Sequence, residues 1–506
     1  MIQPTSGILH RLSARLATLP YGRAVGLATA AGAVLRLATL ARQPLGYDED
    51  FTAVVVHQPA GRMLDILGHD SAPPLFYLLE RAVVVAADFA GLAGFGGPGG
   101  PVALRIVPAI AGIAVIPLLA ALARRVGGDS AGVWAAVFVA FVPTTVMLSG
   151  FVRMYGLGAT LTVAAALLLW RAVEVPVLRR WTLYVVVAAA AVWTDYFCVV
   201  ALAGIFGAAL WLRPGRRVAA TAFAATAIAV GSVAIWLVAA PAQFGHAGQG
   251  FWIAPLGPVM LGGTYGQLFA GPPIHWGIPF APLLYGLQVV AVLAGSAALA
   301  RVAVMWRRGF GPDARRAAAY CLVSTGGVAL LALVSIWRPV LDARYASVMW
   351  LPLLALAGVG LASMPRRFAT LLIAAVAIPT LALSVATTHR ETSALVPELD
   401  AQVGAHDLAA AAWDHYLILL DETGPAVRAR LHVLSTTQLP WYVGTAAYPD
   451  GAEIDEVPSD VITGRGRIFW VADPDVPLPV VPPGYRVGEV RCAIEACLTI
   501  YSPPGD

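Results

Sequence analysis

The sequence predicts a polytopic α-helical membrane protein with a small α/β domain at its C-terminal end. Three observations support this class. Of the 506 residues, 59% are hydrophobic and only 12% are charged, whereas soluble domains carry about 25% charged residues. Apolar runs near the ~20 residues that cross a bilayer as a helix recur through residues 1–387. Residues 388–506, by contrast, are polar and acidic.

About eleven apolar runs predict membrane-spanning helices. No convincing small-residue cleavage site follows the first run, so we expect it to be retained as a span rather than removed as a signal peptide. The runs lie at residues 22–41, 102–123, 130–149, 154–171, 181–198, 199–212, 218–240, 281–303, 317–337, 346–363 and 368–387.

The segment 73–94 is long enough to span but is expected to lie at the membrane surface. It contains Glu80, Arg81 and Asp88, and a charge near the centre of a spanning helix costs about 2.5–3.5 kcal/mol. Counting it as a span would also move Arg124 to the outer side of the membrane, where short loops are not expected to collect Arg. We therefore expect a juxtamembrane helix within a first outer loop at about 42–101.

The placement of Arg predicts the orientation. All 33 basic residues are Arg, and short cytoplasmic loops retain positive charge. With eleven spans, the Arg clusters near residues 11–15, 124–125, 171–180, 213–217, 301–316 and 366–367 fall on one side together with the N-terminus. We expect that side to be the cytoplasm, which places the protein in the plasma membrane with residues 388–506 outside the cell.

The carboxylates follow the opposite distribution. Residues 388–506 hold 17 of the 29 acidic residues and 7 Arg, a net charge of −10. Of the other twelve, only Asp129, Glu174 and Asp313 fall in predicted cytoplasmic loops. Acidic groups therefore collect on the predicted outer face.

The outer domain is predicted from alternating and apolar runs. The stretch "DAQVGAHDLAAAAWDHYLILLDE" suggests a strand followed by a helix, and "ARLHVLST" and "GRIFWVADP" suggest buried strands. Cys492 and Cys497 bracket "AIEA", and a disulfide between them is expected if the domain faces an oxidising compartment. Cys198 and Cys321 lie in apolar runs and are expected to be small buried side chains.

The first outer loop concentrates groups suited to catalysis. Asp48, Glu49 and Asp50 follow the first span, and His69 and Asp70 precede a Pro-Pro pair and an aromatic helix. A carboxylate held at a hydrocarbon boundary is costly unless it is used or paired, and partial desolvation makes it a stronger base. The alternative is that these residues only end the span and solubilise the loop.

The segments "GYDEDFTAVVV", "GHDSAPPLFYLLERAV" and "SGFVRMYG", with the later "RPVLDARYAS", carry a family resemblance. In this order they resemble the GT-C superfamily of integral-membrane glycosyltransferases over residues 25–365. The likeness is to the protein-mannosyltransferase-like and aminoarabinose-transferase-like branch, which includes actinobacterial cell-wall mannosyl- and arabinosyltransferases.

The resemblance implies a polyprenyl-phosphate-sugar donor and an extracytoplasmic active site. It makes Asp48 the general base, with Glu49 beside it as helper or metal ligand, and it places Arg344 and Tyr345 near the donor phosphate. Asp50 is an additional acid, so the choice between Asp48 and Asp50 stays open.

The residues themselves suggest where a lipid phosphate would bind. A departing phosphate must be neutralised, and Arg153 and Arg344 are the two outward Arg at interfacial depth. The alternative for Arg153 is interfacial snorkelling, with Tyr155 in an aromatic belt. For Arg344 the alternatives are the same snorkelling and a structural salt bridge from Asp342 to Arg344 or Arg338.

Further substrate contacts are expected from later outer segments. Asp195 stands where relatives often carry His. It is expected either to bind a sugar hydroxyl or a divalent ion (Mg, Mn or Ca, together with Asp48 and Glu49), or to be a helix-end carboxylate facing water. The aromatic and imidazole side chains of loop 241–280 are candidates for stacking on sugar or isoprenoid, with a membrane-interface belt as the alternative: His246, Trp252, His275 and Trp276.

The leading functional hypothesis is therefore a glycosyltransferase. It would move a sugar, mannose first and arabinofuranose second, from the lipid donor to a glycan, lipid or protein acceptor with inversion. The runner-up is a transporter or flippase of lipid-linked intermediates, which should bury its charges near the midplane. A third hypothesis is a sugar-binding or assembly protein. Nucleotide-binding motifs do not stand out, and no nucleic-acid partner is expected.

Overall fold

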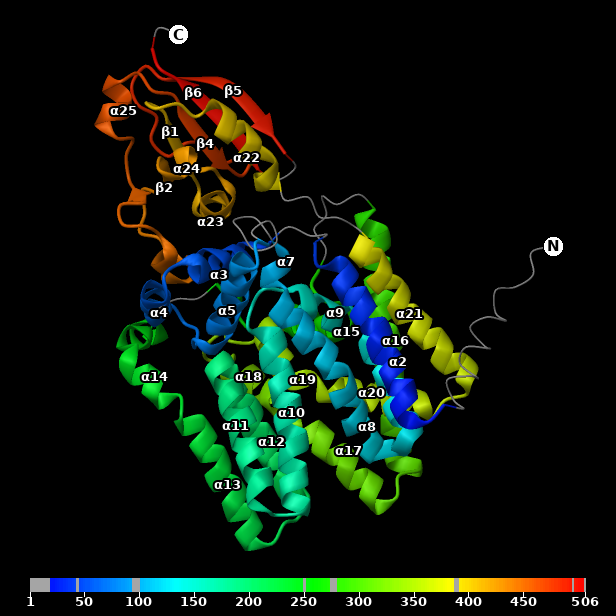
Figure 1. Ribbon diagram of the computed structural model, residues 1–506. Helices are drawn as coiled ribbons and strands as arrows, with labels where there is room; N and C mark the ends of the chain where they lie inside the picture. Colours follow the sequence, from blue (N-terminus) through cyan, green and yellow to red (C-terminus); the bar gives the residue numbers. More distant parts are fainter. Residues whose placement is uncertain are drawn as a thin grey trace, which may run out of the picture.

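The computed structural model describes residues 19–41, 45–92, 101–248, 252–273, 280–385, 391–493 and 496–504. Helices form one large part and a mixed sheet forms a smaller part at the C-terminal end (Figure 1). The first helices are α2 (Tyr21–Thr39), α3 (Tyr47–His57), α4 (Ala60–His69), α5 (Leu75–Phe89), α7 (Pro101–Leu104), α8 (Ile106–Phe141) and α9 (Pro143–Gly150).

The remaining helices of the large part follow in chain order. They are α10 (Tyr155–Glu174), α11 (Leu178–Thr194), α12 (Phe197–Trp211), α13 (Arg216–Gly231), α14 (Ala234–Ala239), the 3-10 helix η1 (Pro241–Gly248), α15 (Pro258–Ala270), α16 (Ala281–Arg308), α17 (Pro312–Ser324), α18 (Gly326–Val334), α19 (Ala343–Trp350), α20 (Pro352–Ala362) and α21 (Arg366–Val385).

The helix α8 covers most of the predicted span 102–123 and the first part of the predicted span 130–149, which continues into α9. Its backbone is non-helical at Gly127 and Gly128, and the φ of 73° at Gly128 favours glycine. A Cβ placed on Gly132 would lie 2.9 Å from the carbonyl oxygen of Ala120, although twelve residues of straight helix extend about 18 Å. The chain therefore folds back, so the predicted spans 102–123 and 130–149 lie side by side.

Among the described residues, six helices are long and apolar enough to cross a membrane, or seven if the bent pair α19 and α20 is one span. This is fewer than the eleven predicted. The helix α8 counts once for two predicted spans, α2 is not among these helices, and α11 and α12, with 17 and 15 residues, are short. The helical class is confirmed. The number of spans stays a prediction.

Close helix packing depends on small residues between α8, α16 and α20. A Cβ on Gly358 would lie 2.4 Å from Ala135 of α8, and one on Gly360 would lie 2.0 Å from the carbonyl oxygen of Ala298 in α16. Since real Cβ atoms do not approach other atoms so closely, glycine lets these backbones touch, as is common in membrane helix bundles.

A buried cation joins α2 to the junction of α8 and α9. Arg36 is 1% exposed, and its guanidinium donates to the carbonyl oxygens of Gly32, Val139 and Ala140 and to the hydroxyls of Ser149 and Thr145. It thereby satisfies carbonyl groups at the end of α8 that have no partner within the helix.

The helix α5 occupies the segment predicted to lie at the membrane surface, and it is not among the helices that could span. Leu79, Val85 and Phe89 are exposed. Glu80 is fully buried, and its oxygens have no hydrogen-bond partner among the described residues. Burial raises the pKa of Glu80 well above its usual value.

The C-terminal part begins with α22 (Glu391–Gln402) and contains a six-stranded sheet of order β3-β2-β1-β4-β6-β5. Strands β1 (Leu408–Ala411), β2 (Leu431–Leu434), β3 (Glu453–Ile454) and β4 (Ile468–Ala472) are parallel, whereas β5 (Arg486–Cys492) and β6 (Cys497–Ser502) are antiparallel neighbours. The short helices are α23 (Trp413–Glu422), α24 (Pro425–Arg428), η2 (Trp441–Val443), η3 (Thr445–Ala447) and α25 (Ser459–Thr463).

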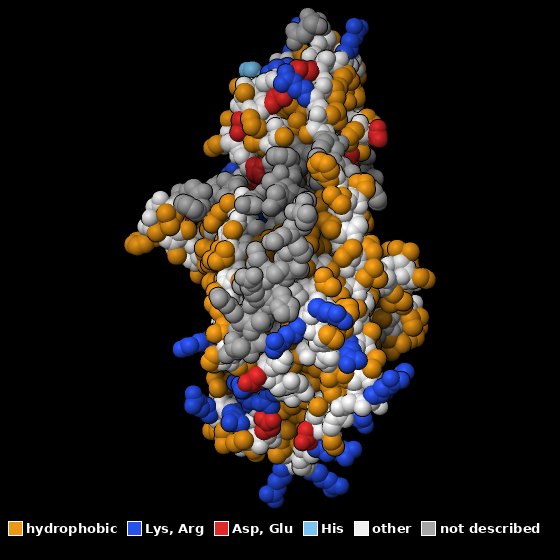
Figure 2. Space-filling view, turned by 90° about the vertical axis from the view of Figure 1, so that its right-hand side faces the viewer, with side chains coloured by type: hydrophobic (Ala, Val, Ile, Leu, Met, Phe, Trp, Pro, Cys, Tyr) orange, Lys and Arg blue, Asp and Glu red, His pale blue; other side chains and the backbone are white. Residues whose placement is uncertain are grey.

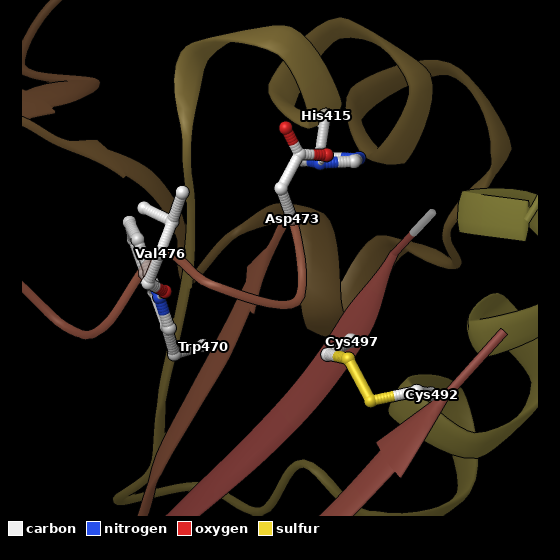
Figure 3. The surroundings of a disulfide bond; sticks show 6 residues. All are labelled: His415, Trp470, Asp473, Val476, Cys492 and Cys497. Carbon is white, nitrogen blue, oxygen red and sulfur yellow. Dashed lines mark hydrogen bonds and ion pairs between the residues drawn. A yellow bond between two sulfur atoms is a disulfide. The ribbon is translucent and has the colours of Figure 1, made fainter. Parts of the chain in front are cut away.

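The predicted α/β domain is therefore confirmed as a fold. The predicted strand-then-helix stretch is β1 and α23, and the two predicted buried strands are β2 and β4. Cys492 and Cys497 are joined by a disulfide that links β5 to β6 (Figure 3). Cys198 and Cys321 are fully buried free thiols, as expected.

The sheet part rests on the first loop through α23, which packs against α3. Tyr47 lies edge-to-face against Trp413, with ring centroids 5.7 Å apart, and its hydroxyl donates to the carbonyl oxygen of Val443 at 2.5 Å. Figure 2 shows Arg side chains gathered at the end of the helical part that lies away from the sheet. The first loop therefore lies at the end opposite the Arg-rich end.

Candidate functional site

The helix α3 begins with the acidic triplet because Glu49 binds the preceding turn. The amide of Gly46 donates to Glu49 Oε2 at 2.6 Å, and the amide of Val152 donates to Glu49 Oε1 at 2.9 Å. The guanidinium of Arg105 lies 3.6 Å from the same Oε1. Glu49, 6% exposed, thus ties the start of α3 to the segment before α10, and its role here is positioning.

Asp48 forms the contact that defines the site. Its carboxylate is paired with the guanidinium of Arg344 at the start of α19. The two side chains are 35% and 38% exposed, respectively, so a substrate can reach both. The structure therefore brings the predicted base and a predicted phosphate ligand together from positions 296 residues apart.

Arg344 is positioned by its own surroundings. Asp342 begins α19 by accepting the amide N–H of Arg344 at 2.8 Å, and its Oδ1 lies 3.6 Å from Arg344 Nε. The guanidinium carbon of Arg344 lies 4.7 Å from the ring centroid of Trp252. The proposed alternative, a bridge to Asp342, is thus present together with the pairing to Asp48.

Arg153 is a second cation beside Asp48. Its Nη1 donates to the main-chain oxygen of Asp48 at 3.3 Å and to the hydroxyl of Tyr77 at 3.2 Å, and its guanidinium lies 5.6 Å from the ring centroid of Phe51. Its Nε is buried and has no hydrogen-bond partner among the described residues. These contacts turn Arg153 toward the loop, away from a simple lipid-facing position.

Aromatic rings line the same region. Tyr345 stacks on Phe197, with ring centroids 4.1 Å apart, and lies 6.1 Å from the ring of Tyr155. Asp195, 2% exposed, accepts the amide N–H of Phe197 at 2.8 Å through Oδ1. Since Asp195 is buried rather than turned to water, that alternative is wrong, and the contact found positions the start of α12.

The other acids of the first loop differ in accessibility. Asp50 is fully buried and Asp70 is 8% exposed, whereas Asp48 is partly open. Of the two candidates for the base, Asp48 is therefore the one that a substrate can reach.

His69 is exposed and lies apart from the Asp48–Arg344 pair. Its ring contacts Asp65 in α4. It lines a cavity of about 460 Å³ between α4 and the loop η2–η3 of the sheet part, together with Arg62, Trp441, Thr445 and Glu453.

Some predicted contacts have no description in the structure. His275 and Trp276 lie outside the described residues, and so does the side chain of His246. Among the described residues, Asp48, Glu49 and Asp195 do not form a group of metal-ligating atoms. A metal at these three positions stays a prediction.

Sequence reasoning missed Tyr77 and Arg105. Tyr77 lies in the helix after the Pro-Pro pair, and its hydroxyl contacts Arg153. Arg105 begins α8 and also donates to the carbonyl oxygen of Leu40 at 2.8 Å. The only available signal was a charged residue at the start of a predicted span, which snorkelling explains equally well.

Comparison with known proteins agrees with this architecture. Residues 90–240 match the family model of dolichyl-phosphate-mannose-protein mannosyltransferase. No curated protein sequence matches significantly. The crystal structure of ArnT from Cupriavidus metallidurans in the apo state is similar over 94% of this chain and 97% of its own, with a TM-score of 0.63 and 16% identity.

Two further solved structures are similar. ArnT from the same organism bound to undecaprenyl phosphate has a TM-score of 0.57, 15% identity and the same coverage of both chains. The Archaeoglobus fulgidus oligosaccharyltransferase complex with Zn and sulfate has a TM-score of 0.48 and 15% identity over 81% of this chain and 62% of its own.

These findings define the class of the protein. It is a polytopic helical membrane protein whose helical part and C-terminal sheet together resemble ArnT along nearly the whole chain. The likeness and the family match confirm the predicted resemblance: the chain has the fold of the GT-C superfamily of glycosyltransferases.

Proposed function

We propose that this protein transfers a sugar from a polyprenyl-phosphate donor to an acceptor hydroxyl. The single observation that carries the proposal is the accessible pair of Asp48 and Arg344, with Arg153 beside it. The ArnT structure that holds undecaprenyl phosphate shares this fold, which supports a lipid-phosphate donor. Mannose is the first donor sugar to test and arabinofuranose the second, with a glycan, lipid or protein as acceptor.

In the proposed reaction the acceptor oxygen attacks the anomeric carbon and its proton passes to the carboxylate of Asp48. The bond between the anomeric carbon and the phosphate oxygen breaks, and polyprenyl phosphate leaves with that electron pair. Attack opposite the leaving group inverts the anomeric centre. The carboxylate supplies general-base catalysis, worth about 10²–10⁴ in rate.

Arg344 and Arg153 neutralise the departing phosphate. An Arg fork matches two phosphate oxygens at once. Because Arg344 is already paired, the donor phosphate would replace Asp48 as its partner and leave the carboxylate available for the acceptor proton. The ligand-free ion pair is thus the resting arrangement of both groups.

The site is proposed to face away from the cytoplasm. It lies at the end of the helical part that carries the acidic sheet part, whereas Arg-rich loops lie at the other end (Figure 2). Since Arg remains in short cytoplasmic loops, this distribution supports a cytoplasmic N-terminus and an outer C-terminal part. A cysteine introduced at Gly46 should react with an impermeant maleimide in intact cells, whereas one introduced at Gly309 should not.

The test uses the purified full-length protein in lipid nanodiscs with a panel of polyprenyl-phosphate sugars. We expect transfer from one donor class, a large loss in Arg344→Gln and a smaller loss in Arg344→Lys, which keeps the charge but not the fork. Asp88→Asn is the matched control, because Asp88 is exposed in α5 of the same loop. Translocation of the lipid-linked sugar without transfer would favour the transporter instead.

A further inference from the structure

A cluster of metal-binding side chains lies in the sheet part, apart from the proposed catalytic site. Asp414 and His415 belong to the first turn of α23, and Asp473 follows β4. One ligand atom from each lies within 4.8 Å of the others. Figure 3 shows the side chains of His415 and Asp473 facing each other.

The imidazole of His415 is oriented like a metal ligand. One ring nitrogen, Nδ1, lies 2.7 Å from the hydroxyl of Thr392 in α22. If Nδ1 carries the proton and donates it to Thr392, then Nε2 keeps a lone pair. A hydrogen-bond partner on the other ring nitrogen commonly fixes the tautomer and the orientation of a histidine that binds a metal.

The other nitrogen points into the cluster and is buried. His415 is 6% exposed, and its Nε2 has no hydrogen-bond partner among the described residues. The buried Oδ1 of Asp414 lacks one as well. Buried polar atoms normally find partners, so two such atoms aimed at one point require an explanation.

The spacing matches a small divalent cation. His415 Nε2 lies 3.3 Å from Asp473 Oδ1 and 3.7 Å from Asp414 Oδ1. Tetrahedral ligand atoms bound at about 2.0–2.1 Å lie roughly 3.3–3.4 Å apart. Small side-chain rotations would therefore bring three ligand atoms to bonding distance of one ion. The side chain of Asp473 is 53% exposed, so water can reach a fourth coordination position.

We propose that Asp414, His415 and Asp473 bind a divalent transition-metal ion, with Zn²⁺ as the probe. One imidazole and two carboxylates suit zinc better than magnesium or calcium, which prefer oxygen ligands alone. The ion would join α23 to the segment after β4. Because α23 packs on α3, which carries Asp48, the ion stiffens the support of the catalytic loop without touching substrate.

Metal binding is measured on the full-length, tag-free protein in detergent after chelator treatment, by equilibrium dialysis and elemental analysis. We expect one high-affinity zinc per chain that excess Mg²⁺ does not displace. Asp473→Asn and His415→Gln should each weaken binding by tenfold or more, and Thr392→Val by about 10–100-fold, the usual cost of losing a ligand's supporting partner.

Asp475→Asn is the matched control, because Asp475 lies in the same exposed segment but outside the cluster, and it should bind zinc like the wild type. Cobalt provides a second readout, since Co²⁺ at the site should give visible absorption bands that Asp473→Asn removes. Asp473 is exposed, so its substitution should not prevent folding. Absence of stoichiometric zinc, or equal zinc binding in Asp473→Asn and the control, would overturn the inference.

Discussion

Replacing the adjacent acids Asp48 and Glu49 by their amides is expected to have opposite effects. Glu49→Gln should mainly lower stability, whereas Asp48→Asn should mainly lower turnover. Glu49→Gln keeps one carbonyl acceptor for two amide donors, from Gly46 and Val152, and removes the charge near Arg105. Losing one buried hydrogen bond to a charged group costs about 1.5–3 kcal/mol. The Asp48–Arg344 pair is more than one-third exposed, so Asp48→Asn should cost at most about 1 kcal/mol of stability.

The expected effects on turnover are reversed. Asp48→Asn removes the proposed base and should lower kcat by about 10²–10⁴, whereas Glu49→Gln should retain kcat within about tenfold at a temperature where it is folded. Stability is measured by heating in detergent with a thiol-reactive dye, because Cys198 and Cys321 are fully buried until the helices separate. Equal thermal shifts in the two variants, or loss of turnover only in Glu49→Gln, would refute the assignment of roles.

Three further outcomes follow from the structure. Burial raises the pKa of Asp407, but hydrogen bonds from main-chain amides and from Arg467 outweigh burial and lower the pKa overall. The ionised carboxylate therefore stabilises the fold, and this contribution is lost as pH falls through the lowered pKa. Denaturation curves at several pH values should show a smaller acid dependence for Asp407→Asn than for the wild type. Gly360→Val should reduce the yield of folded protein in size-exclusion profiles, whereas Gly286→Val, which meets open space, should not. Cys492→Ser should destabilise the sheet part by about 2 kcal/mol, and alkylation should detect two more reactive thiols in the reduced wild type than in the oxidised protein.

Much of the architecture could be predicted because it depends on local patterns. Each segment enters the membrane or stays in water largely according to its own residues. The apolar runs, the Arg clusters and the charges within 73–94 could therefore be interpreted one segment at a time. The short strands around Leu431 and Ile468 could be predicted for a similar reason, since buried parallel strands are apolar over their whole length. Strand β5 was not predicted because it is exposed along its whole length and therefore has no apolar run. Strand β6 was also missed, although it is mostly buried.

The candidate site was predicted only as a set of residues. Asp48, Arg153, Arg344 and Tyr345 were each singled out, but the sequence allowed snorkelling for both Arg residues and a local salt bridge for Arg344. Glu49 was expected beside the base as a helper, whereas the structure shows its oxygens occupied by backbone amides from two segments.

The sequence by itself determined that this chain forms apolar helices, that its acids and Arg residues separate, and that its end forms a mixed α/β unit. Only the tertiary structure decided which charged groups meet. The ion pair of Asp48 with Arg344, and the approach of His415 to Asp473, join segments far apart along the chain. Such contacts depend on how complete helices and strands pack, and no local pattern of residues encodes the distance between two side chains that lie on different elements.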